Sequence, residues 1–156
     1  MVGWSAPTRR TAARAESTSR TSRSISIGAD MAYNEKTHFL QAISSPFNLF
    51  FWVGHNDKDR EKSYFLVQYV GPRTWSQRFR YSFTLKTSDG QQTLSEYQYT
   101  TSYMMDPYSL MNLGQCAIFY NSYVELCLSE AGTLTLELDV VFLDDRKMKM
   151  LFPDRV

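Results

Sequence analysis

The amino-acid sequence predicts an all-β protein: an antiparallel β-sandwich of about eight strands with one short helix. Three observations lead to this fold class. Segments in which apolar and polar residues alternate recur along the chain, as expected for strands with one solvated face. Turn signals separate these segments at intervals of roughly 8–14 residues. Strands and helices do not alternate, which excludes a parallel nucleotide-binding sheet.

The clearest strand signals are residues 78–86 and 133–142, in which every second residue is apolar. Two continuous apolar runs, 47–53 and 63–70, are typical of central strands that are covered on both faces. The polar segment 55–62 between these runs predicts a hairpin loop. The apolar residues of the two alternating strands are Phe79, Tyr81, Phe83, Leu85, Leu134, Leu136, Leu138, Val140 and Phe142.

Turn and helix signals complete this outline. An Asp-Gly pair within 87–91 predicts a tight turn. The one convincing helix begins after Ser122 or Asn121 as N-cap and runs through the sequence YVELCLSEA. We expect Gly132 to end it in the C′ position.

Length and composition limit the possible functions. The 156 residues suffice for one domain, and the 43% that are hydrophobic can form a sizeable core. No apolar stretch reaches the roughly 18 residues of a membrane-spanning helix, so we expect no membrane partner. The net charge of +1 hides an asymmetry: residues 1–24 carry five arginines and one glutamate, and the remainder carries 12 basic and 15 acidic residues. We therefore expect no nucleic-acid partner for the folded part.

The basic N-terminal segment predicts the domain boundaries. Residues 1–24 are rich in Arg, Ser, Thr and Ala without apolar periodicity, which is typical of a disordered tail. An organellar transit peptide is the alternative, but Glu16 and the scattered apolar residues make a poor amphipathic helix. We expect the sandwich over residues 25–143 and a second tail over 144–156.

The residues that could carry chemistry do not form a recognisable catalytic or metal site. His38 and His55 are 17 residues apart without a cysteine pair nearby, so metal binding is not expected. His55 lies in the charged loop and is interpreted as solvated. His38 begins an apolar run, where a structural role competes with a place in a binding groove. Cys116 and Cys127 are interpreted as reduced core thiols of an intracellular protein.

Two further features leave alternatives open. Glu137 and Asp139 share one strand face, where paired carboxylates are usually solubilising and suggest a glycosidase only inside a cleft. The segment 95–108 is rich in Tyr and Met. It could form an adaptable binding surface or only a strand and loop that close the sandwich.

The order of several short motifs resembles the carboxy-terminal domain of the seven in absentia family. That family consists of RING-type ubiquitin ligases with a TRAF-like β-sandwich that binds substrates. The resemblance covers roughly residues 25–142, with Gln115 departing from the family's usual acidic residue. The matching positions are Val67-Gln68, Gly71 and Arg73, Phe79 and Tyr81, Cys116, Phe119, and Gly132 with Leu134.

The resemblance implies a module that recognises substrates without being catalytic itself. The family's RING and zinc fingers need closely spaced Cys and His, which residues 1–35 do not contain. We therefore expect no catalytic residue, no cofactor in this chain and no metal. Whether a RING lies upstream stays open. The implied partners are degron-bearing substrates or adaptors, and a second copy or a family ligase as dimer partner. We expect a cytoplasmic location, with the nucleus as a second one.

The implied binding mode is β-augmentation, in which an extended Pro-x-Ala-x-Val-x-Pro peptide lies beside an early strand. In this chain that strand corresponds to 36–44, flanked by 24–28. By position, His38 replaces a groove tryptophan of the family, and Leu40 replaces a groove methionine. The predicted peptide-binding residues are Lys36, His38, Leu40, Ala42, Ile25 and Ile27.

A second function class stays open beside the first. A TRAF-like scaffold could oligomerise without reading degrons, through an exposed strand edge. For the dimer we expect the later strands, around 91–105 and 133–142. A hydrolase or a lectin lacks a supporting constellation of residues.

Overall fold

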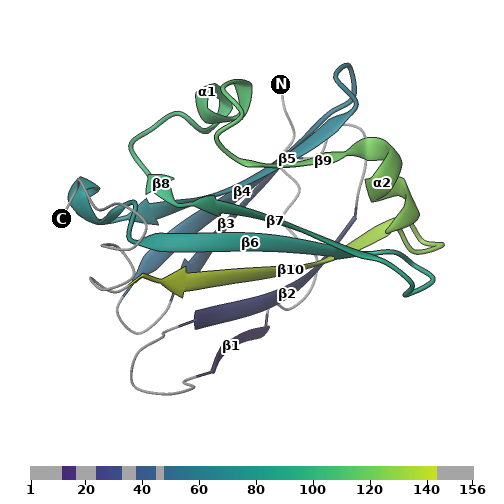
Figure 1. The fold of residues 1–156 in the computed structure, drawn as a ribbon, viewed down its shortest axis with the longest axis horizontal. Helices are drawn as coiled ribbons and strands as arrows, with labels where there is room; N and C mark the ends of the chain where they lie inside the picture. The colour runs from purple at the N-terminus through teal and green to yellow at the C-terminus, as the bar shows by residue number, and fades with distance from the viewer. Residues whose placement is uncertain (1–11, 17–23, 33–37, 45–47, 144–156) are drawn as a thin grey trace.

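The computed structural model describes residues 12–16, 24–32, 38–44 and 48–143, with side chains described at 42–43 and 48–143. Two β-sheets pack face to face, which confirms the predicted all-β, mainly antiparallel sandwich (Figure 1). The described part contains ten strands, two more than expected. They are β1 Ala12–Glu16, β2 Ser24–Ala32, β3 His38–Ser44, β4 Leu49–Asp57, β5 Lys62–Val70, β6 Phe79–Lys86, β7 Thr93–Tyr99, β8 Thr101–Ser102, β9 Ala117–Tyr120 and β10 Thr133–Phe142.

The first sheet has the strand order β1-β2-β10-β6-β7 and is antiparallel throughout. β10 lies in its centre, because it pairs with β2 on one side and with β6 on the other. The predicted alternation is confirmed in β6 and β10, whose apolar residues from Phe79 to Leu85 and from Leu134 to Val140 are buried. In β6 and β10 one face is therefore buried in the core, and the other carries mainly polar side chains.

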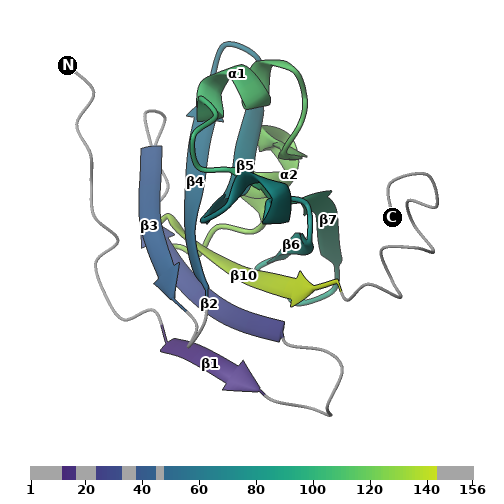
Figure 2. The same ribbon diagram turned by 90° about the vertical axis from the view of Figure 1, so that its left-hand side faces the viewer.

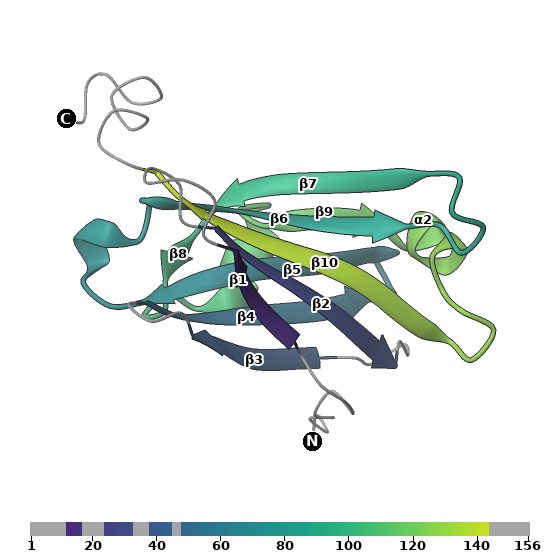
Figure 3. The same ribbon diagram turned by 90° about the horizontal axis from the view of Figure 1, so that it is seen from below.

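The second sheet is built on the two continuous apolar runs. β4 and β5 form the predicted antiparallel hairpin, and β3 pairs with β4 on the far side. Two strands share the remaining edge of β5. β9 pairs with the first half of β5, and the two-residue strand β8 pairs in parallel with the second half. Seen from below, the two sheets form separate layers (Figure 3). β7 approaches β9 on one side, and β1 and β3 are the edge strands on the other (Figure 2).

Aromatic side chains dominate the core between the sheets. The ring centroid of Phe83 lies 5.2 Å from that of Phe65 and 5.9 Å from that of Trp52. Phe50 packs edge-on against Phe79 at 5.0 Å. These five side chains are at most 3% exposed. Burying each of these side chains contributes about 1.5–3 kcal/mol to the stability of the fold.

The helices differ from the prediction. α2 spans Asn121–Leu126, with Tyr120 as N-cap, so it begins one residue earlier and ends well before Gly132. The side chain of Asn121 is not a cap, because it accepts a hydrogen bond from Ser63 and donates one to Asn56. Gly132 has a positive φ of 74° but closes a turn, in which its N–H donates to the Ser129 carbonyl.

A second short helix, α1 Pro107–Asn112, was not predicted. Its start follows capping rules: Pro107 occupies the first turn, and the Asp106 carboxylate accepts a hydrogen bond from the Ser109 N–H. A 3₁₀ turn, η1 Arg73–Trp75, follows β5. The Asp-Gly turn is confirmed, with Gly90 at a φ of 76°.

The expected N-terminal tail contains one strand. Ala12–Glu16 forms β1, in register with Ser24–Gly28 of β2, so the prediction of a tail without secondary structure is wrong for these five residues. Residues 144–156, the predicted second tail, lie outside the described residues. No helix in the described part of the chain is long and apolar enough to cross a membrane.

Candidate functional site

The strand predicted to bind peptide is an edge strand. β3 covers 38–44 of the predicted 36–44, and among the described residues it pairs with β4 alone. The register runs from His38 opposite His55 to Ser44 opposite Leu49. An edge strand presents one row of backbone N–H and C=O groups to its surroundings, which is the geometry that strand addition requires.

The structure separates the predicted site residues. Lys36 lies outside the described residues, and the side chains of His38 and Leu40 lie outside the described part as well. Ile25 and Ile27 belong to β2 in the other sheet, where they pair with Val140 and Leu138. The structure thus does not join β2 to β3 as neighbouring strands.

Ala42 is the predicted site residue whose surroundings are described. It is exposed, whereas the next residue, Ile43, is 3% exposed and belongs to the core. Ala42 is in register with Phe51 of β4, and Phe51 is in register with Gln68 of β5. Along this row burial increases away from the edge: Phe51 is half-buried and Gln68 is buried. The outer face of the sheet is therefore least covered beside β3.

The cover over the rest of this face comes from the segment around α1. Gln68 donates hydrogen bonds from Nε2 to the carbonyls of Ser102 and Met105, at 3.1 and 2.8 Å. Leu110 and Met111 of α1 are buried. Figure 2 shows α1 beside the β4–β5 hairpin and away from β3.

His55 is not a solvated loop residue, as the sequence suggested. It lies in β4, half-buried, with its ring stacked on Tyr64 at 6.2 Å and edge-on to Tyr108 at 5.7 Å. Because Tyr108 belongs to α1, this contact ties the helix to the sheet. The prediction was wrong because β4 ends at Asp57, four residues beyond the apolar run 47–53.

The two halves of the segment 95–108 differ in structure. Its first half forms β7 and β8, which close the sandwich. Beyond β8, Tyr103, Met104 and Met105 are exposed, with Met104 at 74%. A binding role for these apolar side chains stays a hypothesis.

Both cysteines are buried, as predicted for core thiols. Burial raises the pKa of Cys116 to about 12, so its thiol stays protonated at neutral pH and is a poor nucleophile. Burial also raises the pKa of Cys127. Glu137 is exposed on β10, in register with Thr84 of β6.

The described residues contain no group of three His, Cys, Asp or Glu side chains that could hold a metal ion. Comparison with known proteins finds no matching family and no similar curated protein.

Sequence reasoning missed Phe51 and Gln68 as neighbours of the site. Both lie in continuous apolar runs, where period two does not show which face a residue occupies. Only the register through β3, β4 and β5 places them in one row with Ala42.

Proposed function

We propose that this chain is a non-catalytic peptide-recognition module, in which an extended segment of a partner protein adds as a strand to the free edge of β3. On the resemblance to the seven in absentia family, the partner is a degron-bearing substrate or adaptor of a ubiquitin ligase. The observation that carries the proposal is the position of β3 at the end of the strand order β3-β4-β5-β8.

The length and composition of β3 support strand addition. Its seven residues contain no proline that would remove a backbone donor. Edge strands that avoid pairing are usually very short or carry prolines, inward charges or bulges. The described register with β4 runs without interruption over all seven positions.

The outer face beside β3 supports the same mode. A peptide strand added to β3 would direct alternate side chains to this face. There it would meet the small exposed side chain of Ala42 and, one strand further in, the half-buried ring of Phe51. A small residue next to a partly exposed ring leaves apolar surface for a valine or proline of the peptide to cover.

The test is an NMR titration of the ¹⁵N-labelled chain with a peptide that has a Val-x-Pro core. We expect amide shifts in β3 and at Phe51. Ala42→Asp places a charge on the apolar surface that the peptide should cover, so it should weaken binding by at least about tenfold. From the sequence we also expect Leu40→Asp to abolish binding and His38→Trp to strengthen it.

Ala131→Asp is the matched control, because Ala131 is also exposed but lies in the turn before β10. This variant should bind like the wild type. The proposal fails if saturating peptide shifts amide resonances only in the other sheet, or shifts none. It also fails if Ala42→Asp and Ala131→Asp bind the peptide equally well. Absence of peptide binding together with a concentration-dependent dimer would favour the scaffold function instead.

A further inference from the structure

A polar pocket lies at the opposite edge of the second sheet from β3. Its volume is about 380 Å³, within the usual range of small ligand sites. Three segments that are distant in the sequence form it: η1 and the residues after it, the β8 region, and the residue before Cys116. The lining residues are Arg73, Thr74, Ser76, Gln77, Thr100, Thr101, Ser102, Met105 and Gln115.

Buried hydrogen bonds hold two walls of this pocket in place. The Gln68 side chain, itself 4% exposed, donates to the carbonyls of Ser102 and Met105. The hydroxyl of Thr100, which is fully buried, donates to the carbonyl of Ser76. The pocket is therefore preformed, and a ligand would not have to order its walls on binding.

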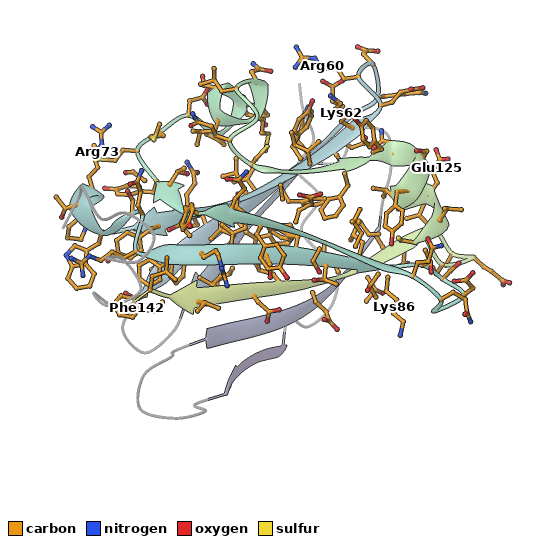
Figure 4. All side chains as sticks on the ribbon, viewed as in Figure 1. Arg60, Lys62, Arg73, Lys86, Glu125 and Phe142 are labelled. Carbon is orange, nitrogen blue, oxygen red and sulfur yellow. The ribbon has the colours of Figure 1, made fainter. Side chains whose placement is uncertain are left out.

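The pocket is rich in donors and carries one charge. Arg73 is the exposed first residue of η1 (Figure 4) and forms no ion pair with the described carboxylates. No acidic residue lines the pocket. The nearest acid in sequence is Asp106, whose carboxylate accepts hydrogen bonds from the N–H and hydroxyl of Ser109 at the start of α1. The amide of Gln115 adds a neutral donor.

Thr101 supplies a further donor. Its hydroxyl is buried and has no hydrogen-bond partner among the described residues. A buried hydroxyl without a partner costs roughly 1–3 kcal/mol, and such groups are uncommon in folded proteins. Because Thr101 lines the pocket, rotation about its χ1 angle can offer the hydroxyl to a bound acceptor.

We propose that this pocket binds the carboxylate of an acidic side chain in a partner polypeptide. The guanidinium fork of Arg73 matches a carboxylate in a two-bond arrangement, and Thr101 and Gln115 donate to the same group. A single cation neutralises one carboxylate but not a phosphate dianion, which favours the carboxylate. An apolar residue beside the acid packs on Met105, which is 38% exposed.

This site is independent of the proposed strand addition. β4 and β5 lie between β3 and β8, so the two edges are separated by three strand spacings, or about 14 Å. A short peptide held along one edge does not reach the other.

The probe is acetyl-Leu-Glu-amide, with acetyl-Leu-Gln-amide as the neutral analogue of nearly the same shape. Titrated into the ¹⁵N-labelled full chain, the Glu peptide should shift amides at 73–77, 100–105 and 115 and saturate in the millimolar range. The Gln peptide should bind at least about tenfold more weakly, because it lacks the charge that the guanidinium recognises. Binding should also weaken as salt is raised.

Two variants test the named donors. Arg73→Gln should weaken binding of the Glu peptide at least about tenfold, and Thr101→Val, which keeps the shape, about fivefold. Arg80→Gln is the matched control: Arg80 is exposed on the outer face of the other sheet, above the Tyr97 ring, and its loss should leave binding unchanged.

Three results would overturn the proposal: no shifts at the pocket, equal affinity of the Glu and Gln peptides, or equal effects of Arg73→Gln and Arg80→Gln. Shifts confined to 38–57 would instead report binding at the β3 edge. The titration can therefore refute the pocket proposal and the strand-addition proposal independently of each other.

Discussion

Gln68 offers a direct test of how the sheet holds the segment after β8. Replacing it with leucine keeps a side chain of similar size but removes the amide that donates to Ser102 and Met105. Each bond contributes about 1 kcal/mol net, because folding exchanges it for a bond to water. The Ser102 carbonyl keeps the Met105 N–H as a donor at 3.1 Å. We therefore expect Gln68→Leu to lower the free energy of unfolding by about 2 kcal/mol.

Urea unfolding followed by tryptophan fluorescence measures this loss, and an unchanged m-value would show that both proteins unfold from equally compact states. The corresponding drop in melting temperature is about 4–8 °C for a domain of this size. Gln91→Leu is the control, because Gln91 is exposed in the β6–β7 turn and should change stability by less than about 0.5 kcal/mol. Equal stability of the two variants would refute the role of the Gln68 amide.

Three further predictions follow from the described contacts. Gly71→Ala would place a Cβ 2.6 Å from the Tyr69 ring, which is packed on Phe79, so unfolding by urea should show a loss of about 1–3 kcal/mol. Because burial raises the pKa of Cys116 to about 12, the neutral thiol stabilises the fold fully below pH 9, and this contribution declines as pH rises toward 12. Between pH 8 and 10 the free energy of unfolding should therefore fall by about 1 kcal/mol more in the wild type than in Cys116→Ala. We expect a homodimer through β7, which is an edge strand among the described residues, and sedimentation at tens of micromolar that shows only an 18.1 kDa species would reject it.

The dimer prediction shows what the sequence could not supply. The later strands were expected at the interface, but β10 is paired on both sides and offers no edge. In the range 91–105, β7 does lie at a sheet edge. Alternation identifies a strand and its two faces, but the order of strands depends on contacts between distant segments, which a local pattern does not contain.

Local signals were reliable where one physical requirement dominated. The bounds of β10 match the alternating segment 133–142, because one face is buried from Leu134 to Val140 and partly buried at Phe142. α1 was missed although Asp106 and Pro107 carry the usual signs of a helix start. The error at α2 is different: Asn121 has a capping side chain, but tertiary hydrogen bonds to Asn56 and Ser63 engage it. Long-range partners outweighed local preference there.

One row of residues explains why the two edges of the second sheet suit different ligands. Ala42, Phe51, Gln68 and Thr101 are successive register partners across β3, β4, β5 and β8. At the β3 end the row is exposed and apolar, so a bound chain gains mainly from backbone pairing and buried apolar area. At the β8 end a buried amide fixes polar walls around a cation, so a ligand gains from charge and directed hydrogen bonds. Raised salt should weaken binding at the second edge and leave binding at the first nearly unchanged, because only one of them depends on an exposed charge.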